Sequence, residues 1–191
     1  MRGIEELSEL LKSDEINSLG KDLGKRIQDK LERSGIYFHI FARVKEAGSI
    51  WHKLEWKKEE YLQKNKKMQD IVGIRIVLYY MDDIAICKEM LKNTYSIIEK
   101  DSHEDKPKVN EFNPLRMNYV CRIPEEFIER FPTKLWEDYR IDKTFEVQIR
   151  TTFSEGWHEV DHEVRYKHKE AWEQHYDFSR ELNGIYATLE V

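Results

Sequence analysis

The apolar positions of the N-terminal segment follow the spacing of an amphipathic helical region. They recur at steps of three, four and six residues over positions 7–31, with an interruption near 13–14. Over 37–45 the pattern changes to an alternation of period two, which predicts a strand whose far end turns basic. The chain is therefore expected to begin with helix and to continue into a sheet.

Apolar runs and polar caps alternate through the middle of the chain. Ser49 is expected to cap a polar helix that runs toward Met68. The apolar, β-branched run at 71–80 predicts a buried strand, and the two aspartates at 82–83 are expected to cap the helix that follows. A short strand is predicted at 95–99.

The second half of the chain adds further strands and helices. A polar segment at 102–114 contains two prolines and predicts a loop, and a short strand is expected at 119–123. Positions 144–150 alternate between apolar and polar residues, which predicts a strand with one polar face. Helical spacing returns over 153–169 and 172–189.

This order of elements predicts an α/β (α+β) fold, in which a mixed sheet of about five strands is flanked by helices. We expect an N-terminal helical segment at 1–35, a central domain at 36–170 and a C-terminal helix at 171–191. The helical pattern is still running at Val191, so we expect that helix to be cut short. Its apolar positions would then lack part of their cover.

Composition indicates a folded protein with one core and argues against a nucleic-acid-binding or membrane protein. A hydrophobic share of 40% within 191 residues is enough for one core, and the net charge of −5 argues against binding nucleic acid through bulk positive potential. Cys87 and Cys121 lie far apart in apolar contexts, and the chain contains no Cys-x-x-Cys pair and no apolar run of about 18 residues. We expect a reduced, cytoplasmic protein with no membrane span.

Candidate chemistry lies in four separated clusters, each of which mixes charges at strand or helix ends. The clusters are Arg43, Lys45, Ser49 and Lys53; Asp70, Gly73 and Arg75; Glu146, Gln148 and Arg150; and Trp157, Asp161, His162, Tyr166 and Lys167. A nucleotide site needs this mixture, because triphosphate oxygens bind Lys and Arg, whereas the bridging Mg²⁺ binds one or two carboxylates.

Two carboxylates in these clusters are candidates for one metal ion. Asp70 precedes a predicted strand and Glu146 lies within another, so the two converge if the strands are neighbours. Glu146 could also accept a proton from an attacking hydroxyl. Each cluster alone has a plainer structural interpretation: Asp70 as a turn residue, and the polar face around Glu146 as the wet side of an edge strand.

The ordered set of motifs adds a family resemblance. The runs DIVGIR from Asp70, EVQIRT from Glu146 and WHEVDHEVRYK from Trp157 resemble, in that order, the signature segments of RelA/SpoT-type alarmone synthetases, the family of the small alarmone synthetases and GTP pyrophosphokinases. The segment from Arg43 to Lys53 is similar to that family's donor-binding segment. The resemblance covers residues from about 40 to about 190.

The resemblance implies a nucleotidyltransferase-like mixed sheet and a Mg²⁺-dependent enzyme. Such an enzyme transfers the β,γ-pyrophosphate of ATP to the 3′-hydroxyl of GDP or GTP and gives AMP and (p)ppGpp, the alarmone of the stringent response. Small members of the family often form tetramers through their terminal helices, so a homo-oligomer is compatible with the resemblance.

The same resemblance assigns roles to residues of this chain. The donor side would consist of Arg43 and Arg75 around the adenine, with Lys45, Ser49 and Lys53 on the phosphates. Asp70 and Glu146 would hold Mg²⁺, with Glu146 also placed to activate the acceptor hydroxyl. Gln148 and His162 would line the acceptor side.

The acceptor segment departs from the family pattern. The family carries Gly-Tyr-x-Ser-x-His, whereas this chain reads NPLRMNYVCRI from Asn113. One register aligns Arg116 with the variable position and puts Leu115 where the tyrosine belongs, and a shifted register makes Tyr119 the residue that stacks on the acceptor base. Both registers stay open at this point, with Tyr119 and Arg116 as candidate acceptor-binding residues.

Three functions are therefore compatible with the sequence. The first is guanosine-nucleotide pyrophosphorylation, and the second is a degenerate nucleotide-binding regulatory module. The third is a toxin-like pyrophosphokinase that acts on an adenosine nucleotide or on the 3′ end of tRNA, and the acidic net charge does not favour tRNA.

Overall fold

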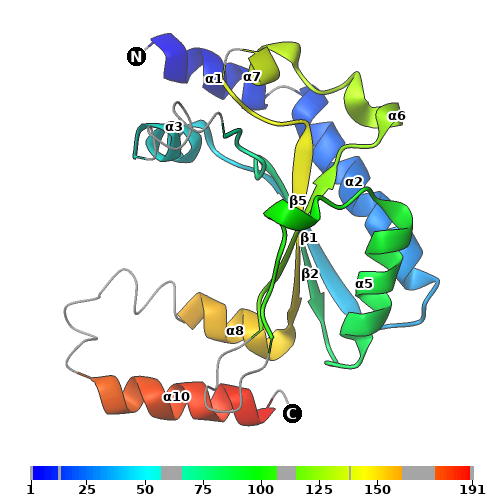
Figure 1. Ribbon diagram of the computed structural model, residues 1–191, viewed down its shortest axis with the longest axis vertical. Helices are drawn as coiled ribbons and strands as arrows, with labels where there is room; N and C mark the ends of the chain where they lie inside the picture. The colour runs from blue at the N-terminus through cyan, green and yellow to red at the C-terminus, as the bar shows by residue number, and fades with distance from the viewer. Residues whose placement is uncertain are drawn as a thin grey trace.

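A five-stranded mixed sheet runs through the middle of the molecule (Figure 1). The computed structural model describes residues 2–12, 14–56, 66–106, 115–137, 139–160 and 175–189. In spatial order the strands are β1 (Phe38–Val44), β2 (Val72–Leu78), β5 (Thr144–Thr151), β4 (Met117–Arg122) and β3 (His103–Glu104). β2 and β5 run parallel and the other neighbouring strands antiparallel, which confirms the predicted mixed sheet.

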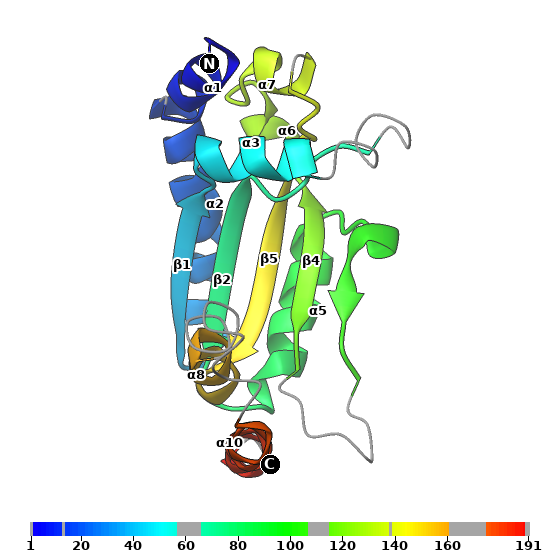
Figure 2. The same cartoon turned by 90° about the vertical axis from the view of Figure 1, so that its left-hand side faces the viewer.

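Helices cover the two faces of the sheet unequally. α2 (Asp14–Glu32) and α5 (Asp83–Thr94) pack along one face, whereas α3 (Ala47–Trp56), α8 (Thr152–Val160) and α10 (Tyr176–Leu189) lie on the other side (Figures 1 and 2). Figure 2 shows α3 crossing one end of the strands and α8 the other, so the middle of that face is open between them. The remaining elements are α1 (Arg2–Lys12), α6 (Glu125–Ile128), α7 (Thr133–Glu137) and the 3₁₀ turn η1 (Glu99–Asp101).

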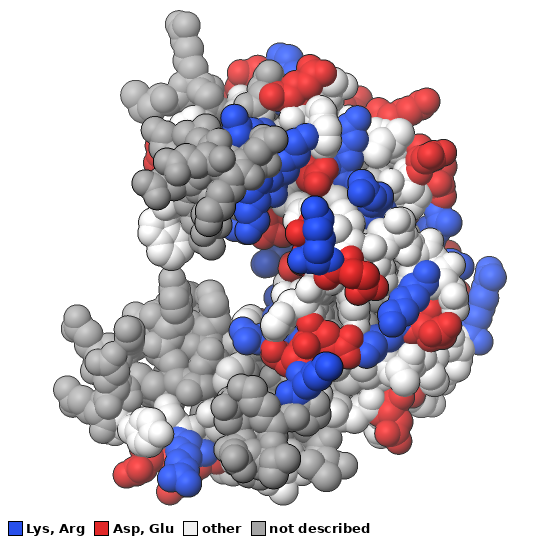
Figure 3. Space-filling view, in the orientation of Figure 1, with Lys and Arg blue, Asp and Glu red and all other residues white. Residues whose placement is uncertain are grey.

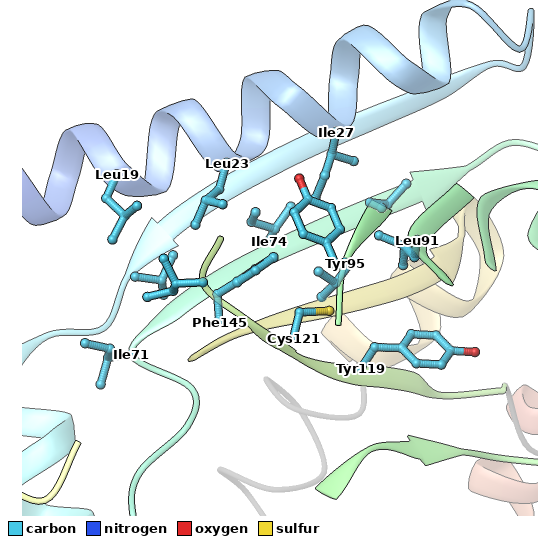
Figure 4. Packing of buried hydrophobic residues seen from close by; sticks show 14 of the residues in the cluster. Leu19, Leu23, Ile27, Ile71, Ile74, Leu91, Tyr95, Tyr119, Cys121 and Phe145 are labelled. Atoms are coloured by element: carbon cyan, nitrogen blue, oxygen red, sulfur yellow. The ribbon is translucent and has the colours of Figure 1, made fainter. Parts of the chain in front are cut away.

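The hydrophobic core lies between the sheet and the α2/α5 layer. One stripe of α2, formed by Ile16, Leu19, Leu23, Ile27 and Leu31, is fully buried. It meets the apolar side of the central strands, including Ile74 and Phe145 (Figure 4). Because successive strand residues point to opposite faces, the polar positions of the same strands are left on the far side.

Most predicted elements are confirmed. The N-terminal helical region is divided into α1 and α2, and the period-two segments at 37–45 and 144–150 form β1 and β5. The division of the chain at 35 and 170 stays a prediction. In the part of the chain that the structure describes, no helix combines the length and the apolar character needed to cross a membrane.

Four local predictions were wrong. Asp82 occupies the N-cap position of α5, but its side chain makes no capping hydrogen bond. Ser49 does not cap α3: the amide of Ile50 donates to the carbonyl of Glu46 at 3.1 Å, so the helix begins before Ser49 and its first turn includes this residue. The segment predicted as a loop at 102–114 contains β3. The expected strand at 95–99 is reduced to one bridge, between Ile97 and Cys121, followed by η1.

Candidate functional site

A cavity of about 260 Å³ opens on the polar face of the sheet, away from α2 and α5. Its lining comes from β1, β2, β5 and the segment before β2: Phe41, Arg43, Lys45, Asp70, Ile71, Gly73, Ile74, Arg75, Glu146 and Gln148. Figure 3 shows the hollow on the side that carries α3 and α8, where basic and acidic side chains lie close together.

The strand register explains why these side chains meet. Arg43 pairs with Gly73, which pairs with Glu146, so these three positions form one row across the sheet. The next row contains Phe41, Arg75 and Gln148. The condition on which Asp70 and Glu146 were expected to converge, that their strands are neighbours, is therefore met.

Asp70 is held by two lysines from different elements. Its Oδ2 accepts from Nζ of Lys45 at 2.7 Å and from Nζ of Lys53 in α3 at 2.8 Å. Burial alone would raise the pKa of Asp70, but the hydrogen bonds and charges of the two lysines outweigh it and hold the pKa below its ordinary value. Asp70 is therefore an anion between two cations at neutral pH.

The carboxylates at this cavity fit a divalent cation. Asp70 Oδ1 is buried without a hydrogen-bond partner, although such oxygens are normally satisfied. Glu146 lines the same cavity, and its Oε2 accepts from Nε2 of Gln148 at 2.8 Å. Among the described residues no group of three or more His, Cys, Asp or Glu forms a metal cage. Two carboxylates suit Mg²⁺, which takes its remaining ligands from substrate phosphates and water.

A second charged network links the cavity to α8. Glu155 accepts from Nη1 of Arg75, and its other oxygen accepts from Nη1 of Arg150 at 2.8 Å. Both guanidinium groups also donate to Oε1 of Gln148, Arg150 at 3.3 Å and Arg75 at 3.4 Å. Burial and the charge of Arg75 lower the pKa of Arg150, and Glu155 counteracts both.

Most of the predicted donor residues are brought together. Arg43, Lys45 and Arg75 line the cavity, and Lys53 reaches it through Asp70. Ser49 lies exposed on α3 and is not among the lining residues that the structure describes. From the last motif, Trp157 donates from Nε1 to Asn183 of α10 at 2.8 Å. His162, like Asp161, Tyr166 and Lys167, lies outside the described residues.

The two candidate acceptor residues do not lie at the cavity. Tyr119 pairs with Val147 and points into the α2/α5 core, where it is 3% exposed (Figure 4). Its hydroxyl donates to Oε2 of Glu104 at 2.9 Å, and burial together with Glu104 raises its pKa. Stacking of Tyr119 on an acceptor base does not fit this placement, because the sheet separates its ring from Glu146. Arg116 is exposed and pairs with Asp105 at 3.1 Å.

Sequence reasoning missed several residues of the site. Phe41 lines the cavity with its side chain 58% exposed, and the same alternation that identifies Arg43 could have found it. Asn118 pairs with Gln148, so it lies on the cavity side of β4. Glu155 gave no signal in the sequence, because its contacts depend on how α8 turns back over the sheet.

Taken together, the mixed sheet, its helical layers and the terminal helices have the alarmone synthetase fold. The crystal structure of the small alarmone synthetase 1 from Bacillus subtilis bound to its product pppGpp superposes with a TM-score of 0.68 at 21% identity, over 93% of this chain and 90% of that one. The same synthetase bound to AMPCPP gives a TM-score of 0.62 at 20% identity, over 93% and 89% of the two chains. At these identities the likeness concerns the fold.

Sequence comparison identifies the family. Residues 42–171 match the family described as the region found in RelA / SpoT proteins, and the chain belongs to that family. Among curated relatives, the GTP pyrophosphokinase YjbM of Bacillus subtilis (strain 168) is 28% identical over 131 residues, which are 68% of this chain. The match spans 56% of the length of that relative.

Proposed function

We propose that this protein transfers pyrophosphate from ATP to the 3′-hydroxyl of a guanosine nucleotide, GDP or GTP, and gives (p)ppGpp and AMP. The observation that carries the proposal is the convergence of Asp70 and Glu146 on one cavity beside Lys45, Arg43 and Arg75. This set supplies carboxylates for a metal ion, cations for phosphates and planar groups for a base.

The donor nucleotide is assigned to the β1/β2 side of the cavity. Lys45 and Lys53 donate to the same carboxylate oxygen, and the positive charge of their ammonium groups suits the oxygens of a triphosphate. Arg43 and Arg75 hold the adenine, because a guanidinium group stacks on an aromatic plane. Phe41, next to Arg75 in the register, adds an apolar wall for the base. Ser49 is proposed as a further phosphate ligand.

The metal ion is assigned to Asp70 and Glu146. The unpartnered Oδ1 of Asp70 is available to a cation without loss of the lysine contacts on Oδ2. Bound there, Mg²⁺ neutralises charge on the donor phosphates.

The acceptor is assigned to the β5/β4 side. Gln148 and Asn118 pair across the two strands and offer amide groups on the side of the sheet that carries Glu146, with His162 proposed as an additional contact. Glu146 takes the proton of the 3′-hydroxyl, whose oxygen forms a bond to the β-phosphorus of ATP. The bond from the β-phosphorus to the oxygen bridging the α-phosphate breaks, and AMP leaves.

The comparisons support the choice of donor and acceptor nucleotides. A relative named GTP pyrophosphokinase and similar structures that hold pppGpp and AMPCPP make a guanosine acceptor and an adenosine donor the first pair to test.

The test is a transfer assay with Mg²⁺, γ-labelled ATP and each of GMP, GDP, GTP, ADP, ATP and bulk tRNA. Label on GDP or GTP, with AMP released in equal amount, is the expected result. Glu146→Gln is the matched variant, because it preserves shape but removes the proton acceptor and one metal charge. We expect it to lower transfer at least about a hundred-fold, in the range of lost general-base catalysis, with the fold intact.

A second candidate function follows from the acceptor strand. β4 presents Asn118 and Val120 to the cavity side, whereas its tyrosine is buried on the other. Label only on an adenosine nucleotide or on tRNA would mean that the acceptor side has changed its specificity. ATP binding without any transfer would instead identify a nucleotide-binding regulatory module.

A further inference from the structure

One carboxylate on α8 joins two arginines from different strands. Glu155 lies in the first turn of α8, directly after β5, and binds Arg75 of β2 with one oxygen and Arg150 of β5 with the other. The exposed side-chain fractions are 18% for Glu155, 21% for Arg75 and 6% for Arg150. Because the three groups are largely shielded from water, this contact is stronger than an ion pair on the surface.

The same contact determines how Gln148 is oriented. A guanidinium group only donates hydrogen bonds, so the amide oxygen of Gln148 must face Arg75 and Arg150. Its amide nitrogen is then directed at Glu146, to which it donates at 2.8 Å. A chain of contacts thus runs from Glu155 through the arginines and Gln148 to Glu146.

The negative charge of Glu155 is needed to keep Arg75 and Arg150 close together. Arg75 and Arg150 are like charges that share one amide oxygen, and the carboxylate between them offsets their repulsion. Arg75 also meets Glu159 at 3.4 Å, but the Glu159 side chain is 57% exposed and touches Arg75 from the solvent side. Glu159 cannot replace a carboxylate that binds both arginines at once.

We propose that Glu155 is a positioning residue that holds Arg75 at the donor base and, through Arg150 and Gln148, directs Glu146 toward the reacting groups. The inference rests on the proposed function, since it assumes that an adenine nucleotide occupies the Arg75 side of the cavity. Glu155 itself touches neither substrate: it acts through its neighbours, and so couples base recognition on β2 to the catalytic carboxylate on β5.

The test compares two ligands, one that carries an adenine base and one that has no base. We would measure the Kd of α,β-methylene-ATP with Mg²⁺ by calorimetry, and that of inorganic tripolyphosphate by competition, in the wild type, Glu155→Gln and the control Glu159→Gln. Glu155→Gln is expected to raise the Kd of α,β-methylene-ATP about ten-fold, which is the scale of the coupling energy between contacting residues. Tripolyphosphate, which is assigned to Lys45 and Lys53, should stay within about two-fold, as should both ligands with Glu159→Gln.

A turnover measurement completes the test. At saturating ATP, Glu155→Gln should also lower kcat about ten-fold, because Glu146 loses its oriented partner, whereas Glu159→Gln stays near the wild type. A wild type that binds α,β-methylene-ATP but transfers nothing defeats the proposed function alone, since the two-ligand comparison still decides whether Glu155 positions Arg75.

Several results would overturn the inference. One is an unchanged Kd for α,β-methylene-ATP in folded Glu155→Gln. Another is an equal rise in the Kd of both ligands in that variant. The third is an equal rise in the Kd of α,β-methylene-ATP in Glu159→Gln. Should Glu155→Gln fail to fold, the two ligands are compared in Glu155→Asp, which keeps the charge but is too short to bind both guanidinium groups. An unchanged ratio of the two Kd values in that variant overturns the inference equally.

Discussion

At the scale of single residues, Asp70 has two roles, one for each carboxylate oxygen. Oδ2 binds two lysines, and Oδ1 is buried without a partner. The lysine contacts stabilise the fold, and the free oxygen suits the metal ion. A change at Asp70 is therefore expected to affect both stability and activity, and pH separates the two effects.

Asp70→Asn should remove an acid-sensitive part of the stability. The folded-state pKa of Asp70 lies below the ordinary 3.8, so the unfolded chain takes up the proton first as pH falls. The stabilisation is complete above 3.8 and is lost as pH falls through the folded-state pKa. Urea unfolding between about pH 7 and pH 3 should show a gap between wild type and variant that narrows only at the acid end. Parallel curves throughout would contradict this assignment.

Phe41→Ala should weaken donor binding through the base alone. Stacking of an aromatic side chain on a base contributes about 1–3 kcal/mol, so the Kd of α,β-methylene-ATP should rise roughly five- to one-hundred-fold. Tripolyphosphate binding should not change. Tyr37→Ala is the matched control, because this ring is 68% exposed just before β1 and lies outside the cavity lining. Equal effects of the two substitutions would remove Phe41 from the site.

Residue-level prediction from the sequence succeeded where one strand determined the outcome. Alternation along β1 puts Phe41 and Arg43 on one side of that strand, and alternation along β5 does the same for Glu146 and Gln148. It failed for Tyr119, whose face depends on the register of β4 against β5. No local pattern identified Glu155, because its partners belong to two other elements.

At the scale of elements, two glycines determine how closely α2 approaches β1. A Cβ added at Gly24 would lie 3.2 Å from the Cβ of Ala42, whereas one at Gly20 would lie 3.7 Å from Val72 and 3.8 Å from Val44. The first contact is tight and the second ordinary. Since Ala42 precedes Arg43 on β1, movement of this strand would also reach the cavity.

The two glycines therefore predict different responses to alanine. Gly→Ala within a helix favours the helix by up to about 1 kcal/mol. Gly20→Ala should show this gain in chemical denaturation, whereas Gly24→Ala should show a smaller gain or a loss. In an Ala42→Gly background, which removes the close methyl group, Gly24→Ala should show the full gain relative to Ala42→Gly alone. If both single substitutions stabilise equally, the approach of α2 to β1 is not limited by Gly24.

The sequence predicted elements best where the pattern was long. Seven or more alternating positions identified β1 and β5, and their bounds differ from the prediction by at most one residue at either end. β3 was missed because its two residues, His103 and Glu104, are too few for any period. The cap assigned to Ser49 was wrong because the first turn of α3 closes on the carbonyl of Glu46, which no side-chain preference reveals.

At the scale of the whole molecule, the charges of the site differ from those of the chain. The net charge is −5, so the molecule as a whole repels nucleotides. The proposed binding of a triphosphate would therefore depend on local lysines and on a cation that offsets the charges of Asp70 and Glu146.

Removal of Mg²⁺ should consequently weaken the binding of the nucleotide as well as slow the reaction. With EDTA, the Kd of α,β-methylene-ATP should rise at least about ten-fold, because the triphosphate then faces the carboxylates of Asp70 and Glu146 without a metal ion between them. The double variant Asp70→Asn/Glu146→Gln should bind equally well with and without Mg²⁺. Metal-independent binding by the wild type would show that these carboxylates do not hold the ion.

The pairing of β2 with β5 has a consequence for how the protein folds during its synthesis. Arg75 and Gln148 are in contact although 73 residues separate them in the chain. Pairing of such distant strands is slow, because closing a long loop costs conformational entropy before the contacts between the strands can offset it. A growing chain on the ribosome therefore already carries Lys45, Asp70 and Arg75 for much of its synthesis, but it completes a nucleotide site only after β5 has emerged. We therefore expect the proposed transfer activity to arise only once β5 has paired with β2.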